Sequence, residues 1–208
     1  MATFKSTTFG KISGKYGEAL ATKSKITGKN YLRPVSEPSN PRTPKQVEHR
    51  GKFGYINRAM RSFYPVFKIT FGGNVGIRFG INIAFMNAIQ GEYPDFSLDY
   101  TQLLFTDGAL YRTNKATAQK SGVSSVKIDW DYSVMAGNNS ADLVNLIFFN
   151  EDEDQAILEQ AIVNREAATV KVELPAIWAG GKIHCWMYFC TPDGVTNSTS
   201  QYIEMVQL

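Results

Sequence analysis

The sequence has little of the chemistry that most metal sites and many enzymes use. Its 208 residues include only two cysteines, Cys185 and Cys190, and two histidines, His49 and His184. No CxxC, HxH or HExxH spacing occurs, and the Walker Gly-Lys-Ser/Thr sequence is absent. We therefore expect no catalytic residue, no metal site and no cofactor, and we predict that the protein is not an enzyme.

Long apolar runs are also missing. No stretch approaches 18 consecutive apolar residues, and the first residues lack the apolar region of a secretion signal, so we expect neither a membrane span nor secretion. Cys185 and Cys190 are five residues apart in a strand-like run, which places their side chains on opposite faces, so no disulfide is expected between them. The expected location is a virion or the cytoplasm.

The two parts of the chain each lack charge of one sign. Residues 1–80 contain 15 Lys and Arg but only three acids, a net charge of +12. Residues 81–208 contain 7 bases and 16 acids, a net charge of −9, so the total of +3 conceals a split. Such asymmetry predicts a polyanionic partner, or a second copy of the chain that docks positive surface against negative surface.

Residues 1–36 are predicted to form a basic β-arm. Gly14 and Gly28 supply turn positions between short strands, and most other residues are small, polar or basic. Such an element buries little apolar surface by itself, so we expect it to lie against a partner. A proline-rich linker follows at residues 37–43. The candidate partner-binding residues are Lys11, Lys15, Lys23, Lys25, Lys29, Arg33, Arg42 and Arg50.

A helix start is encoded at the end of the linker. Thr43 is suited to cap the helix, and Pro44 is suited to its first position. Gln46 completes a capping box three residues after the cap. Apolar residues at 3- and 4-residue spacings then continue the helical pattern.

The rest of residues 44–122 is predicted to be helical and then β. Pro65 should kink or end the first helix, and a second helix should cover about 75–90 with Gly91 as its C-terminal cap. Alternating apolar residues after this helix, with a turn at Asp107-Gly108, predict a hairpin.

Residues 123–208 are predicted to form an Ig-like or fibronectin-III-like β-sandwich, so the fold class is α+β, mainly β. Trp130 is expected to be enclosed between the sheets, whereas Trp178, which follows a Leu-Pro break, is expected to be half-exposed. Residues 151–167 are assigned to a short helix or an acidic loop. Apolar alternation and apolar runs predict strands at 124–132, 143–149, 169–174, 182–190 and 200–208.

Some acidic and aromatic residues allow both a functional and a structural interpretation. The run Glu151–Asp154 lacks the ligand order of an EF-hand and is interpreted as a solvated loop. Asp129 and Asp131 resemble the acid pair of a glycosidase, but strand alternation explains them equally well. Trp178 or Trp186 would be the platform of a carbohydrate-binding sandwich, which is one alternative function.

Several motifs occur in order over nearly the whole chain: Gly10-Lys11-Ile12-Ser13-Gly14-Lys15-Tyr16-Gly17, Tyr31-Leu32-Arg33, Asn40-Pro41-Arg42-Thr43-Pro44-Lys45-Gln46 with Arg50, Gly91–Phe96 and Asn197–Tyr202. Together they resemble an uncharacterised family, a domain of unknown function common in Bacteroidota genomes and their mobile elements. The resemblance implies no established activity and agrees with the predicted fold. The Asn-Pro-x-Thr-Pro-x-Gln-x-x-x-Arg segment is also similar to one in many phage structural proteins.

These observations predict a non-enzymatic structural or assembly protein. The basic arm would dock on neighbouring subunits of a homo-oligomer or of a particle shell, as a minor capsid, connector or tail component of a phage virion does. The alternative is a nucleic-acid-binding protein that uses the basic N-terminal half, in which aromatic residues lie among the bases. No membrane partner is expected.

Overall fold

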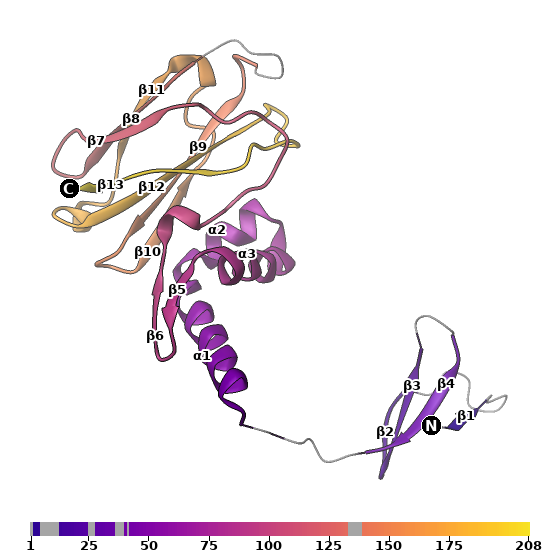
Figure 1. Cartoon of the computed structure of the whole chain (residues 1–208). Helices are drawn as coiled ribbons and strands as arrows, with labels where there is room; N and C mark the ends of the chain where they lie inside the picture. The colour runs from indigo at the N-terminus through magenta and orange to yellow at the C-terminus, as the bar shows by residue number, and fades with distance from the viewer. Residues whose placement is uncertain (1, 5–12, 25–27, 36–39, 41, 133–138) are drawn as a thin grey trace. The chain divides into compact units, whose positions relative to one another are not determined.

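The computed structural model describes residues 2–4, 13–24, 28–35, 40, 42–132 and 139–208, with the backbone alone for residues 2–4. It divides the chain into two compact units, Met1–Thr43 and Pro44–Leu208. The described residues are mainly β, with three α-helices and four antiparallel sheets (Figure 1). The predicted class, α+β and mainly β, is confirmed at this level.

The first unit contains a four-stranded antiparallel sheet with the order β1-β4-β3-β2. Its strands are β1 (Ala2–Phe4), β2 (Gly14–Tyr16), β3 (Ala19–Lys23) and β4 (Asn30–Pro34). Gly28, with φ +68°, lies between β3 and β4, where the sequence predicts a hairpin tip. Ala21 is the one buried hydrophobic side chain among the described residues of this unit. The described part of the unit is therefore a single-layer sheet with very little core.

The second unit begins with helices α1 (Pro44–Ala59), α2 (Tyr64–Thr70) and α3 (Gly73–Asn87), with the 3-10 turn η1 (Arg61–Phe63) before α2. Helix α1 thus begins at Pro44, the residue that the sequence places in its first position. Pro65 ends no helix by itself, because it lies in the first turn of α2, where a missing N–H is tolerated. A Cβ at Gly80 would lie 2.5 Å from Cδ1 of Phe67, so α2 and α3 pack through a glycine.

Removal of the Thr43 hydroxyl should weaken the start of α1. We expect Thr43→Ala to lower the free energy of unfolding by about 1 kcal/mol, because an N-cap acceptor would be lost. Thr43→Ser retains the oxygen and serves as the matched control. Equal denaturation midpoints for Thr43→Ala and the wild type would show that this side chain does not cap the helix.

Two antiparallel sheets follow in the second unit, with the orders β11-β8-β7 and β10-β9-β12-β13. Their strands are β7 (Ala116–Lys120), β8 (Ser125–Trp130), β9 (Leu143–Asn150), β10 (Gln155–Glu159), β11 (Thr169–Glu173), β12 (Lys182–Cys190) and β13 (Gln201–Gln207). A separate hairpin and three 3-10 turns complete the unit: β5 (Ile89–Glu92), β6 (Asp95–Leu98), η2 (Tyr100–Gln102), η3 (Arg165–Ala167) and η4 (Ala176–Trp178). The five strands predicted after residue 123 are confirmed.

The sheet β10-β9-β12-β13 is buried on both faces. Phe148 and Met187 point into a core shared with β7, β8 and β11. Phe149, which follows Phe148, and Trp186, which precedes Met187, point to the opposite face, into a second core with the helices. Figure 1 shows α2 and α3 beside this sheet, opposite the three-stranded sheet. The helices and both sheets thus form one unit, because they share the central sheet.

Two turn predictions are wrong. Gly91 does not cap α3, which ends at Asn87; it lies in β5 with φ +85° and its backbone approaches Asp95 O too closely for a side chain. Asp107-Gly108 does not form a hairpin either, because this segment runs beside Asn197 and pairs only through isolated bridges at residues 109 and 110. The hairpin that does form is β5–β6, upstream of that turn.

The assignment of residues 151–167 to a helix or acidic loop is also wrong in part. Glu151–Asp154 is a turn, but Gln155–Glu159 forms β10 and pairs with β9. The strand was not recognised because it follows an acidic run and has only three apolar residues, Ala156, Ile157 and Leu158. Strand β7 was not predicted for the same reason: its sequence, ATAQK, is short and polar.

The expectation for Trp178 is wrong, while that for Trp130 is confirmed. Trp178 is fully buried and Trp130 is 4% exposed. The 3-10 turn η4, directly after Pro175, turns the Trp178 indole into the core between the sheets, where its Nε1 donates to Gln155 Oε1 at 3.4 Å. Trp130 donates from Nε1 to the Arg165 carbonyl at 2.9 Å.

We expect Trp178→Ala to be as damaging as Trp130→Ala, and each to cost about 3–5 kcal/mol, because each would leave a large cavity in the same core. Trp178→Phe, which restores most of the apolar volume, should recover a large part of the loss. Chemical denaturation of the three variants measures this. A loss below about 1 kcal/mol for Trp178→Ala would contradict its burial.

Candidate functional site

The arm sheet carries a basic pair on one face. Lys15, Leu20 and Arg33 are aligned across β2, β3 and β4, so their side chains share a face. Lys15 and Arg33 are exposed, and with Leu20, Pro34 and Val35 they line a hollow of about 110 Å³. Two cations beside a partly buried leucine are suited to bind a partner that presents a carboxylate next to an apolar group.

The opposite face of the arm sheet is more apolar. The aligned row Tyr16, Ala19 and Pro34 lies beside Leu32 on this face. Tyr16 is 56% exposed and Leu32 is 37% exposed. A hollow of about 400 Å³ is lined by these four residues together with Glu18 and Arg33. A partner could therefore gain apolar contact here and charge contact on the other face.

The remaining candidate partner-binding residues do not join the Lys15–Arg33 pair. Lys23 points to the apolar face, and Lys29 and Arg42 are exposed beyond the strands. Arg50 is exposed on α1 and belongs to the second unit. Lys11 and Lys25 lie outside the described residues.

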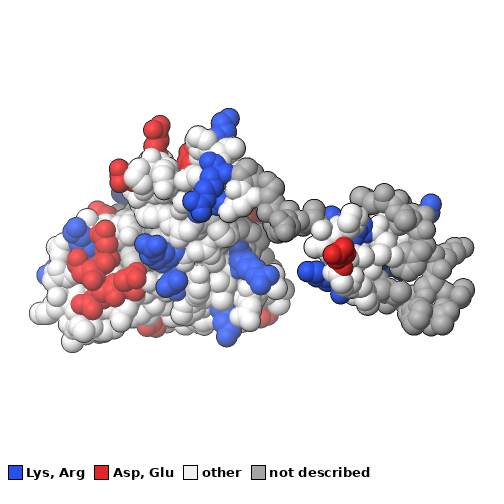
Figure 2. All heavy atoms as spheres, turned by 90° about the horizontal axis from the view of Figure 1, so that it is seen from below, with Lys and Arg blue, Asp and Glu red and all other residues white. Residues whose placement is uncertain are grey.

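Charge on the second unit is distributed unevenly. On the face shown in Figure 2, Lys and Arg groups are separated by uncharged surface, while several acidic groups lie together. In the turn Glu151–Asp154, Asp152 accepts from the Lys182 backbone N–H at 3.1 Å and Asp154 accepts from the Ser62 hydroxyl at 2.6 Å. These bonds hold an acidic turn at the surface.

A histidine lies within an aromatic group on the helix-facing side of the central sheet. His184 stacks on Tyr100 with ring centroids 4.1 Å apart, and its Nδ1 lies 3.0 Å from Tyr202 Oη. Its Nε2 lies 3.9 Å from Glu151. Burial lowers the pKa of His184, more than Glu151 raises it. Cys185 points into the other core, so the two adjacent residues do not form one site.

Acid should destabilise the protein where His184 titrates. Its folded pKa is below the unfolded value of 6.5, so the unfolded chain binds the proton more tightly. The stability that neutral His184 contributes is complete above about pH 6.5 and is lost as the pH falls towards the folded pKa. The thermal midpoint of the wild type should thus fall more between about pH 7 and 5 than that of His184→Gln. Equal falls would contradict this.

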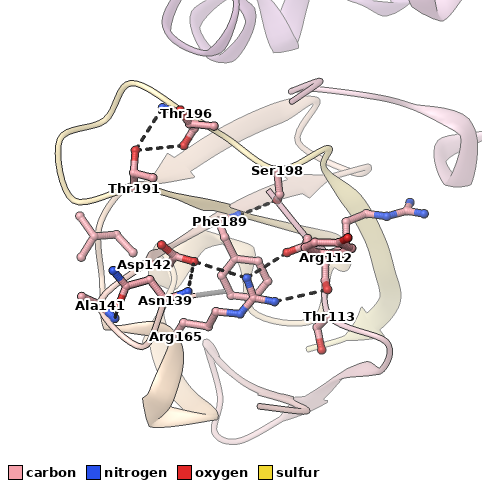
Figure 3. Close-up of polar contacts among 12 residues, drawn as sticks. Arg112, Thr113, Asn139, Ala141, Asp142, Arg165, Phe189, Thr191, Thr196 and Ser198 are labelled. Carbon is pink, nitrogen blue, oxygen red and sulfur yellow. Dashed lines mark hydrogen bonds and ion pairs between the residues drawn. The ribbon is translucent and has the colours of Figure 1, made fainter. Parts of the chain in front are cut away.

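The second unit encloses a buried ion pair that the sequence did not indicate. Arg165 and Asp142 are 1% and 0% exposed, and Arg165 Nη1 lies 3.6 Å from Asp142 Oδ2. Figure 3 shows the guanidinium over the Phe189 ring, 4.0 Å from its centroid. Nη1 donates to the Tyr111 carbonyl at 2.9 Å, and Nη2 donates to the Arg112 carbonyl at 3.3 Å. Arg165 thereby fixes the backbone of a surface segment.

Other residues considered from the sequence have structural roles. Asp129 forms an ion pair with Lys127 at 2.8 Å, and the hydrogen bond from Lys127 lowers the pKa of Asp129. Trp186 is fully buried, as is Trp178, so neither is a platform for a sugar ring. Among the described residues, no group of three or more His, Cys, Asp or Glu could hold a metal ion.

The match of the chain to a family model extends over residues 11–204. The chain belongs to the family of unknown function DUF6266. The expected membership of an uncharacterised family is thus confirmed. No curated protein matches the chain. None of the described helices is long and apolar enough to cross a membrane.

Proposed function

We propose that this family member is a non-enzymatic structural protein of a self-assembling particle, in which Met1–Thr43 docks on a neighbouring subunit. One observation carries the proposal: the described part of this unit is a single-layer sheet whose buried hydrophobic side chain is Ala21 alone. Chains of about 40 residues rarely bury enough surface to be stable without a partner, a metal or disulfides. A partner surface would supply the missing layer.

The chemistry of the arm indicates an acidic partner surface. The Lys15–Arg33 pair supplies charge on one face, and Tyr16 and Leu32 supply apolar area on the other. Residues 81–208 carry a net charge of −9, so a second copy of the chain presents the complementary sign. Complementary surfaces on one chain favour head-to-tail contacts, which build rings or filaments.

We further propose that residues 116–207 have the topology of a fibronectin-III-like sandwich. Taken in chain order, the first, second and fifth strands form one sheet, and the third, fourth, sixth and seventh form the other. This arrangement of three strands against four supports the proposal. The likeness of the Asn40–Arg50 segment to phage structural proteins suits a virion as the particle.

Light scattering on the full chain tests the assembly. At about 50 mM salt we expect a mass above the 23.2 kDa monomer, and about 500 mM salt should reduce it, because charge contacts are screened. The double variant Lys15→Ala/Arg33→Ala should associate less than the wild type. Lys120→Ala/Lys115→Ala, which removes two exposed bases from the second unit, is the matched control. A monomer at every salt and protein concentration would overturn self-assembly.

Oligonucleotide binding tests the alternative function. If the basic half binds nucleic acid, affinity should fall with salt at a log–log slope of about −0.7 to −0.9 per phosphate contacted. We expect weak binding at about 150 mM salt, because the described bases are divided between two units and both faces of the arm sheet. Micromolar binding at that salt, lost in Lys15→Ala/Arg33→Ala, would favour the nucleic-acid function instead.

A further inference from the structure

The segment at Phe105 and Thr106 is hydrogen-bonded to the residues just before β13. The Thr106 hydroxyl donates to the Ser198 carbonyl at 2.7 Å, and the Ser200 N–H donates to the Thr106 carbonyl at 3.1 Å. The Ser200 hydroxyl accepts from the Phe105 N–H at 2.8 Å. Ser198 and Ser200 directly precede β13, an edge strand of its sheet, so the segment lies beside the residues that lead into this edge.

Two neighbouring hollows are lined by residues on either side of this segment and by the start of β13. Their volumes are about 460 Å³ and 380 Å³, and both are lined by Arg112 and Gln201. We call them together the Arg112 groove. The groove has four side-chain amides, those of Asn87, Gln102, Asn114 and Gln201, and no acidic side chain among the described residues that line it. Its cation is Arg112, and none of the described carboxylates forms an ion pair with it.

Hydrogen bonds from the protein interior fix the backbone of residues 111–113, which line this groove. Arg165 donates to the carbonyls of Tyr111 and Arg112, and Thr113 donates to the Asp131 carbonyl at 3.0 Å. In Figure 3 the Arg112 side chain extends away from Arg165. The buried Arg165 therefore fixes the backbone, and the exposed side chain of Arg112 can contact a ligand. A wall whose backbone is fixed loses less entropy when a ligand binds.

We propose that the Arg112 groove binds an acidic saccharide, with the sugar carboxylate on Arg112 and the hydroxyl groups on the surrounding amides. A guanidinium binds a carboxylate through two parallel hydrogen bonds. Side-chain amides both donate and accept, as the hydroxyl groups of a sugar require. Tyr111, which is 57% exposed, offers an aromatic face to the apolar side of a sugar ring. This site is independent of the proposed assembly through the arm.

The lining of the groove favours a saccharide over an acidic peptide. An extended peptide that adds to a strand edge is recognised through pockets for its alternate side chains. Leu103 and Leu104 are the aliphatic residues among the described lining, and Leu103 is 1% exposed. Hydroxyl and amide groups dominate the rest, and they match a ligand covered with hydroxyl groups.

Calorimetry with the full-length protein tests the proposal, with tetragalacturonate as the probe. We expect tetragalacturonate to bind, and Arg112→Gln to weaken it about tenfold or more, as expected when a charge-assisted hydrogen-bonded pair is lost. Gln201→Ala should weaken it less, because it removes a neutral partner. Arg78→Gln, which removes an exposed arginine of α3 outside the groove, should leave binding unchanged.

Two further probes separate the possible ligands. Maltotetraose, which is neutral, should bind at least tenfold more weakly than tetragalacturonate, and a tetraglutamate peptide should not compete with it. Equal binding of the peptide would assign the groove to acidic protein segments and overturn the proposal. The absence of tetragalacturonate binding at millimolar concentration, or binding that Arg112→Gln leaves unchanged, would also overturn it. Neither result depends on whether the arm assembles.

Discussion

The central sheet β10-β9-β12-β13 is apolar on both faces, and the architecture of residues 44–208 depends on this property. A sheet with two apolar faces must be covered twice, because exposed apolar area of that size is not stable in water. The sheet β11-β8-β7 covers one face and the helices cover the other. The helices therefore cannot be removed without exposing Phe149 and Trp186. For the same reason, the helical region and the strands form a single unit.

The arm presents the opposite situation. Its described strands pair well, but neither face is covered by a second layer among the described residues of the unit, and the exposed residues include Tyr16 and Leu32. Backbone pairing alone stabilises a small sheet only marginally. The helices cover one face of the central sheet. None of the described residues of the arm covers a face of the arm sheet in this way. This contrast is the reason for proposing a partner surface on the arm and not on residues 44–208.

Strong apolar runs made most of the fold predictable, and weak ones concealed the rest. LVNLIFF and KIHCWMYFC are apolar at consecutive positions, which is typical of strands buried on both faces. β7 and β10 were not predicted, because these short edge strands contain only a few apolar residues. Trp178 was misplaced because a proline before it indicates a break but not the direction in which the chain turns. The Arg112 groove was unpredictable, because its residues come together only after folding.

The Arg165–Asp142 pair shows how a buried charge can fix the backbone of a surface segment. Burial of two charges costs free energy unless hydrogen bonds and mutual attraction offset it, and apolar residues of similar size often stabilise a core better. Here the pairing is incomplete: Asp142 Oδ1 and Arg165 Nε have no hydrogen-bond partner among the described residues. Stability alone therefore does not account for the pair. Arg165 does one thing that an apolar side chain could not do: it binds the carbonyls of Tyr111 and Arg112. The pair is thus best understood through the surface that it fixes.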